Sequence, residues 1–316
     1  MKTNNKSRLK GGFYKILKVK SMWRINNYYK FTEYFNFIEY DKSRDKTEDW
    51  KFSDLFFRQN TYVEKGILQK MRNIKLTIEY DGKDFNGWQK QPTKLNIQGT
   101  IEQAIKIVTG EDVDLMASGR TDAGVHAFGQ VANFKTNSNI PIEKMPIAIN
   151  SNLKKSIRII SAEEVDERFH SRLTCKRKTY RYVINNSEFS SAIYRNLETH
   201  IPQKLDIEKM KQAAKYFEGE HDFKAFKASG TSSKSSVRTI YKAKVYAMPN
   251  NRIYIELTGN GFLYNMVRII AGTLVDVGTG KIQPEYIEKI IESKDRSLAG
   301  KTLQPNGLYL LEVNYK

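Results

Sequence analysis

The chain of 316 residues has little of what disulfides and metal sites require. Its single cysteine, Cys175, excludes an internal disulfide and a cysteine-rich metal site. The four histidines form no pair at helical or turn spacing, which argues against zinc. One of them, His126, is more typical of a structural histidine than of a catalyst. We therefore expect chemistry without a metal.

The sequence also lacks long apolar runs. No stretch of about 18 apolar residues is present, so no segment is expected to span a membrane. Neither the apolar core of a signal peptide nor its cleavage site is visible, and no clear basic amphipathic helix suits a membrane surface. These absences favour a cytoplasmic protein without a membrane partner.

Positive charge is abundant. The chain has 53 Lys and Arg against 35 Asp and Glu, which gives a net charge of +18. A field of this sign concentrates polyanions, above all nucleic acid. A host proteome in which every protein is basic would give the same number. On charge alone, we favour nucleic acid as the partner.

Residues 1–70 differ from the remainder of the chain. They contain sixteen Lys or Arg against eight Asp or Glu, and their aromatics follow neither a strand nor a helix period. Met71 then opens a regular pattern. We interpret residues 1–70 as a basic N-terminal extension that is either disordered or the product of a mis-called start codon. A basic arm that adds RNA affinity and a transit peptide are the alternatives.

Residues 71–175 predict one α+β half. Apolar residues alternate in "IKLTIEY" (74–80), which predicts a half-buried strand. In the segment 97–110, apolar residues recur at helical spacing before a glycine, which predicts a helix. Two further strands are expected at 130–136 and 156–165.

Residues 176–316 repeat this pattern. Strands are expected at 178–184, 239–248, 252–259 and 307–313, and helices at 206–219, 265–278 and 284–293. Strand–helix–strand–strand units in both halves predict two ferredoxin-like α+β units whose sheets join.

The stretch "SGRTDAGVHA" (118–127) is too polar for a core strand. Two interpretations of Asp122 are open. It caps its own backbone in an Asx-type turn, or the loop presents it to a ligand. In the second case we expect Arg120 to keep the carboxylate ionised, because a nearby positive charge lowers its pKa. The flanking glycines would let a bulky ligand approach the backbone.

Several motifs resemble those of the tRNA pseudouridine synthase A family. "ASGRTDAGVHAFGQVANF" resembles the active-site motif of that family nearly residue for residue. The likeness covers residues 71–316 and includes "YDGKDFNGWQKQP", "NIQGTIEQA", "FHSRLTCKRKTYRYVI", "GEHDFKAF", "GNGFLYNMVRIIAGTL" and "GLYLLEV". Residues 1–70 have no counterpart in the family pattern.

The resemblance implies a pseudouridine synthase fold, with two ferredoxin-like halves in a mixed sheet and a basic RNA-binding cleft. It implies isomerisation of uridine to pseudouridine at positions 38, 39 and 40 of the tRNA anticodon stem-loop, without cofactor or metal, by a homodimer. Asp122 would be the catalytic aspartate and Arg268 its partner. Tyr180 would pack on the target base, Arg120 would hold the flipped nucleotide, and Leu308 would line the uracil pocket.

The residues alone allow plainer roles for these side chains. On pattern alone, Tyr180 and Leu308 are more typical of core residues than of a binding site, whereas Arg268 in an apolar helix requires a paired anion. A cluster of basic residues near Tyr180 suits a solvated face or RNA contact, namely Lys176, Arg177, Lys178 and Arg181. Two other functions compete with the isomerase: a non-catalytic tRNA-binding or refolding protein, and a metal-dependent hydrolase of nucleic-acid phosphates.

Overall fold

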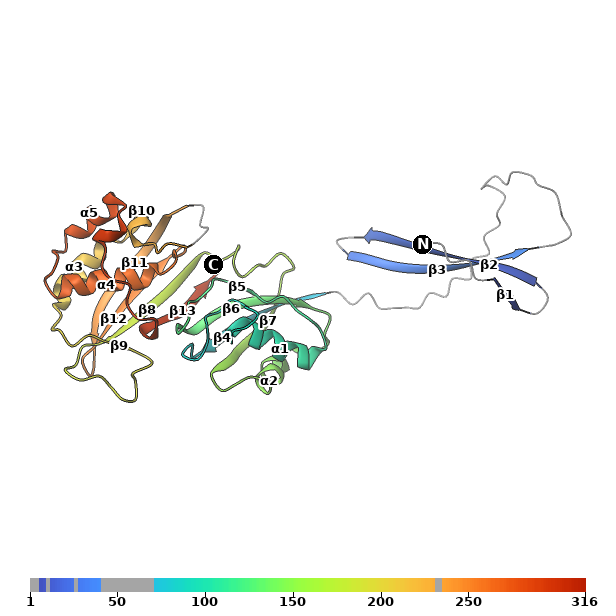
Figure 1. Ribbon diagram of the computed structural model, residues 1–316, viewed down its shortest axis with the longest axis horizontal. Coiled ribbons are helices and arrows are strands. Elements are labelled where there is room, and N and C mark those ends of the chain that lie inside the picture. The colour runs from blue at the N-terminus through green and yellow to red at the C-terminus, as the bar shows by residue number, and fades with distance from the viewer. Residues whose placement is uncertain (1–5, 10–11, 26–27, 41–70, 231–234) are drawn as a thin grey trace. The chain divides into compact units, whose positions relative to one another are not determined.

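The computed structural model describes residues 6–9, 12–25, 28–40, 71–230 and 235–316 (Figure 1). The chain divides into two compact units, Met1–Gly66 and Ile67–Lys316.

The first unit contains an antiparallel three-stranded sheet of β1 (Lys6–Leu9), β2 (Gly12–Ile25) and β3 (Tyr28–Tyr40). Strands β2 and β3 pair from Phe13 opposite Tyr40 to Ile25 opposite Tyr28. Residues 41–70 lie outside the described residues. The interpretations of residues 1–70 as an extension, and the boundary at residue 175, stay predictions.

The second unit is built on a mixed sheet with the strand order β10-β11-β12-β8-β13-β6-β4-β7, to which β5 and β9 add at β6 and β8. The strands are β4 (Arg72–Tyr80), β5 (Met116–Ala117), β6 (His126–Thr136), β7 (Ile157–Val165), β8 (Arg177–Asn185), β9 (Thr199–His200), β10 (Gly219–Asp222), β11 (Val237–Met248), β12 (Arg252–Gly259) and β13 (Leu308–Asn314). The helices are α1 (Ile97–Thr109), α2 (Met145–Asn150), α3 (Ile207–Lys215), α4 (Met266–Gly278) and α5 (Tyr286–Ser293).

Local sequence signals explain where α1 begins and ends. The Asn96 side chain caps the helix by accepting a hydrogen bond from the Gly99 amide at 2.8 Å. Gly110 ends it in the left-handed conformation, with φ of 74°, which glycine adopts without strain. Apolar side chains at helical spacing, such as Ile101 and Ile105, are fully buried against the sheet.

The C-terminal half repeats this construction with more helices. Figure 1 shows α3, α4 and α5 gathered at the C-terminal strands, and α1 and α2 at the N-terminal strands. Helix α4 is buried almost throughout, so its single charged residue in the first turn, Arg268, enters an apolar environment.

The two halves meet at the centre of the sheet. Strand β13 pairs antiparallel with β8 and parallel with β6, where Tyr309 lies opposite His126 and Leu310 opposite Ala127. This arrangement confirms the predicted α+β class with two strand–helix halves in one mixed sheet. The structure differs in detail: β6 begins at His126, earlier than the predicted residue 130, and the two-residue strands were too short to leave a periodic signal.

Among the helices of the described residues, none combines the length and apolarity needed to cross a membrane.

Deleting residues 1–70 should leave a folded protein, because Ile67–Lys316 forms a compact unit by itself. We expect the truncated chain to unfold cooperatively, with a Tm within a few degrees of the full chain. Circular dichroism of both chains during heating checks this. A broad transition in the truncated chain alone would contradict it.

Candidate active site

The loop between β5 and β6 is bonded to β6 at its start and closes with a turn at its end. The Ser118 amide donates to the Val131 carbonyl at 2.7 Å, and the Val125 amide donates to the Asp122 carbonyl at 3.2 Å. The loop therefore leaves the sheet and returns to it within a few residues. Asp122 lies at its tip.

The Asp122 side chain faces Arg268, from the other half of the sheet. Arg268 Nη1 lies 3.4 Å from Asp122 Oδ2, and the two side chains are 15% and 29% exposed. Among the hydrogen bonds of the described residues, the Asp122 carboxylate accepts this one and none from an amide of its own loop. The Asx-turn interpretation is therefore wrong for this side chain, because its partner lies across the sheet.

Arg268 also bonds two acceptors other than Asp122, and these hold its side chain in place. Its Nε donates to the Leu303 carbonyl at 2.7 Å, and its Nη1 donates to Asn265 Oδ1 at 2.8 Å. Asn265 precedes α4 with φ of 60°, a left-handed conformation that asparagine tolerates. The guanidinium is thus fixed by two acceptors of its own half and aimed at the carboxylate of the other.

Two opposing effects act on the pKa of Asp122. Burial raises the pKa, and the nearby Arg268 guanidinium lowers it through charge and hydrogen bonding, with a net rise above the ordinary aspartate value. The expectation that Arg120 lowers this pKa is wrong. Arg120 is exposed and forms no ion pair within the described part of the chain, and the ion-pair partner of Asp122 there is Arg268.

Tyr180 lies close to this pair. It is buried on β8, and its ring meets Phe262 edge-on with centroids 5.2 Å apart. Burial raises the pKa of Tyr180, and the negative charge of Asp122 raises it further. The phenol therefore stays neutral at physiological pH.

Tyr182, two residues further along β8, has a structural role. Its hydroxyl donates to the Gln304 carbonyl at 2.6 Å and lies 2.6 Å from Thr199 Oγ1. Leu308 is buried opposite Tyr182 in the sheet. The structure thus brings Asp122 and Arg268 together with Tyr180 nearby, and places Leu308 in the adjoining core.

Sequence reasoning missed the buried polar groups that hold the loop. Tyr80 Oη lies 2.8 Å from Thr121 Oγ1. Gln130 receives a hydrogen bond from Ser118 Oγ at 2.7 Å and donates to the Gly119 carbonyl at 3.0 Å. The only signal for Gln130 was a polar residue at the start of an apolar strand. Its role depends on tertiary contacts with Ser118 and Gly119, which the sequence pattern does not reveal.

The segment after β4 supports the loop from another side. The Trp88 amide donates to the Thr121 carbonyl at 3.0 Å, next to Asp122. A Cβ at Gly87, which has φ of 79°, would lie 2.6 Å from the same carbonyl oxygen. Only glycine allows this close approach without strain.

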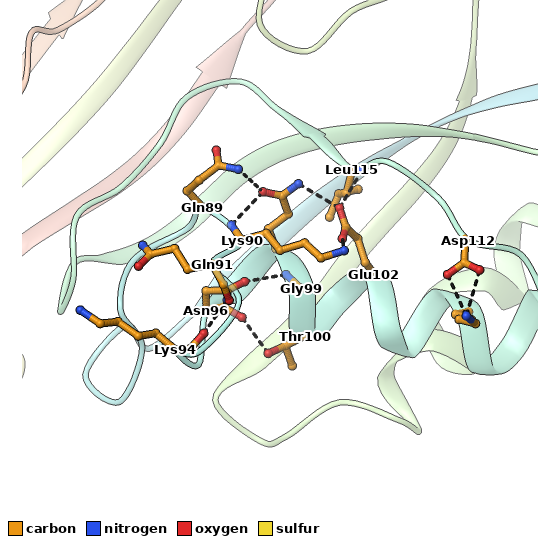
Figure 2. Close-up of polar contacts among 12 residues, drawn as sticks. Gln89, Lys90, Gln91, Lys94, Asn96, Gly99, Thr100, Glu102, Asp112 and Leu115 are labelled. Carbon is orange, nitrogen blue, oxygen red and sulfur yellow. Dashed lines mark hydrogen bonds and ion pairs between the residues drawn. The ribbon is translucent and has the colours of Figure 1, made fainter. Parts of the chain in front are cut away.

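A polar network on α1 fixes that segment (Figure 2). Gln98 Oε1 accepts from Gln89 Nε2 at 3.0 Å and from the Lys90 amide at 3.1 Å. Its amide nitrogen donates to Glu102 Oε1 at 2.9 Å. The buried Glu102 also accepts from Lys90 Nζ at 2.8 Å and from the Leu115 amide at 3.1 Å. Glu102 therefore ties the segment after β4 to the chain that leads into β5.

Within the described residues, no group of three or more His, Cys, Asp or Glu side chains is placed to hold a metal ion.

The comparisons with known proteins agree with this geometry. The family model described as tRNA pseudouridine synthase matches residues 76–172 and 213–316, which include Asp122 and Arg268. The chain therefore belongs to the tRNA pseudouridine synthase family.

Individual relatives have the same family name. The chain is 55% identical to tRNA pseudouridine synthase A of Caldicellulosiruptor saccharolyticus, 53% identical to that of Acetivibrio thermocellus and 46% identical to that of Clostridium acetobutylicum. Each match spans 245 residues, which is 78% of this chain and 100% of the relative. A chain in the crystal structure of a Cbf5-Nop10-Gar1 complex aligns at 12% identity over 75% of this chain and 57% of that chain, with a TM-score of 0.30, below the value that indicates a shared fold.

Replacing Glu102 by Gln should destabilise the protein. The Gln oxygen can still accept from Gln98 Nε2 and the Leu115 amide, but the new NH2 group would face Lys90 Nζ, which loses its charged acceptor. Because Lys90 is largely exposed, this loss should cost about 1 kcal/mol. The matched control is Asp112→Asn, since Asp112 is 84% exposed and its ion-pair partner among the described residues is Lys106, in solvent. Thermal unfolding should show a Tm fall of several degrees for Glu102→Gln and almost none for Asp112→Asn. Equal Tm values would contradict the assigned role.

Proposed function

We propose that this protein isomerises uridine to pseudouridine in tRNA, at positions 38, 39 and 40 of the anticodon stem-loop, with Asp122 as the catalytic carboxylate. The observation that carries the proposal is the partly buried Asp122–Arg268 pair inside the family match. The relatives named tRNA pseudouridine synthase A support the choice of substrate.

The reaction suits a single carboxylate. The N1–C1′ bond of uridine breaks, the uracil turns, and C5 bonds to C1′ while the proton on C5 is lost and N1 gains one. Atoms and electrons balance without water, oxidant or cofactor. An ionised Asp122 acts as a nucleophile at the ribose, and Arg268 keeps it anionic despite its burial.

The substrate base must leave its stack to reach this carboxylate, at a cost of a few kcal/mol. We propose that the ring of Tyr180 contacts the extruded uracil, an aromatic contact worth about 1–3 kcal/mol. Leu308 would lie at the edge of the uracil pocket. The exposed Arg120 would contact the flipped nucleotide or its phosphate, which is consistent with its freedom from protein ion pairs in the described residues.

From the same family likeness we infer a homodimer that works in the cytoplasm on tRNA bound in a basic cleft. The net charge of +18 supports attraction of the RNA. Light scattering of the purified chain measures the oligomeric state directly.

Asp122→Asn should abolish pseudouridine formation while RNA binding is retained. The substitution keeps the size of the side chain but removes the nucleophile, so turnover should fall by on the order of 10³-fold or more. Pseudouridine mapping in anticodon-arm RNA incubated with pure protein measures turnover, and gel-shift titration measures binding. Asp112→Asn is the control and should behave as wild type.

Other outcomes separate the alternatives. If the wild-type protein forms no pseudouridine and Asp122→Asn changes nothing, the non-catalytic RNA-binding function is favoured. Inhibition by a chelator would instead favour a metal-dependent hydrolase.

The rate should fall as the pH is lowered, because the reaction requires ionised Asp122. Since the pKa of Asp122 is raised, this fall should begin at a higher pH than for an ordinary aspartate. Arg268→Gln removes the group that lowers this pKa, so the acid limb of kcat/KM should move to higher pH. Arg268→Lys keeps the charge and should move it less. An unchanged acid limb in Arg268→Gln would show that Asp122 does not control this titration.

A further inference from the structure

Lys178 lies directly against the loop that carries Asp122. Its Nζ donates to the Ser118 carbonyl at 2.6 Å. A Cβ added at Gly119 would lie only 3.0 Å from the same nitrogen. The ammonium therefore touches the two residues that begin the loop, although Lys178 belongs to β8 in the other half.

The charge of Lys178 has no carboxylate partner among the described residues, although its side chain is partly buried. An ammonium has three hydrogens to donate, and the Ser118 carbonyl takes one of them. Three other partly buried cations of the sheet are paired: Arg181 with Glu256, Arg72 with Glu164 and Arg252 with Glu198. An unpaired cation in this setting costs free energy unless an anion arrives.

Two arginines add to this positive charge. Burial lowers the pKa of Lys178, Cys175 raises it, and the charges of Arg172 and Arg238 lower it further, so both guanidinium groups interact electrostatically with the ammonium. Arg172 follows Ser171, whose amide donates to Asn133 at 2.9 Å and whose hydroxyl donates to the Met116 carbonyl, which fixes this chain beside β5.

Arg238 approaches from β11. A Cβ added at Gly261, in the segment that contains Phe262, would lie 3.6 Å from Arg238 Nε. Lys178 thus touches the start of the catalytic loop, and two arginines from two other segments act on its charge. Like charges gathered in this way form a site for an anion with several acceptor oxygens, as a phosphate has.

We propose that Lys178, Arg172 and Arg238 bind one backbone phosphate of the RNA next to the target uridine. The site links RNA position to catalysis, because the ammonium that holds the phosphate also holds the Ser118 carbonyl, four residues before Asp122. This inference rests on the proposed function, since that function makes RNA the source of the phosphate.

The first test is the salt dependence of RNA binding. Each phosphate contact contributes about 0.7 to 0.9 to the slope of log K against log salt concentration. In the full-length Asp122→Asn protein, which leaves the RNA unmodified, Lys178→Met should reduce the slope by this amount. The control is Lys215→Met, an exposed lysine at the end of α3 that loses the same unit of charge. Fluorescence anisotropy with anticodon-arm RNA gives both slopes.

The second test identifies the phosphate. A set of anticodon-arm RNAs carries one uncharged methylphosphonate linkage each, at successive positions around the target uridine. At one position the neutral linkage should weaken binding of the Lys178-containing protein about fivefold and leave Lys178→Met unaffected. At the other positions both proteins should lose affinity equally. If no linkage distinguishes the two proteins and the slopes are equal, the phosphate site is wrong.

A third test measures whether inorganic phosphate alone binds at this site. At constant ionic strength, it should raise the Tm no more than chloride does, because the RNA supplies the anion together with many other contacts. A rise in Tm that Lys178→Met abolishes, without coupling to any linkage, would overturn the RNA source in favour of free phosphate.

Failure of the proposed function has a different signature. If the wild-type protein forms pseudouridine and Lys178→Met shows the wild-type slope and no coupling, the phosphate site alone is wrong. If one linkage couples to Lys178 and no pseudouridine forms, the phosphate site holds and the isomerase function fails.

Discussion

The contact between Asp122 and Arg268 is the interaction on which the candidate active site depends. One member comes from the loop before β6 and the other from the first turn of α4, 146 residues away in the chain. They meet only because β13 joins the two halves by pairing with β6 and β8. The sheet and its joining strand therefore serve to hold the carboxylate opposite the guanidinium in a partly buried ion pair.

Two opposing requirements act on the protonation state of Asp122. Burial favours its neutral form, whereas attack on a ribose requires its ionised form. Arg268 shifts the balance toward ionisation without removing the partial burial that makes the charge reactive. The guanidinium can do this because the Leu303 carbonyl and Asn265 already hold it in place, so little ordering remains when substrate binds.

The loop that carries Asp122 is held from three directions. Tyr80 and Trp88 support it from the N-terminal half, Gln130 supports it from β6 beneath, and Lys178 supports it from the C-terminal half. Most of these contacts go to backbone carbonyls, which fix the course of the chain whatever the side chains are. A loop with so many polar residues can therefore keep one geometry without a large apolar core of its own.

The sequence by itself determined the regular elements and the candidate catalytic residue. Alternation of apolar residues predicted β4 and β8, helical spacing predicted α1 and α4, and "GRTDAG" singled out Asp122. Each of these signals is contained in a short stretch of sequence, so it can be recognised without the fold. Only the tertiary structure decided which cation faces Asp122. Local reading chose Arg120, two residues away, while the family likeness implied Arg268. The fold turns Arg120 to solvent and brings Arg268 to 3.4 Å, because electrostatic effects depend on distance through space and on burial, which neighbours in sequence do not specify.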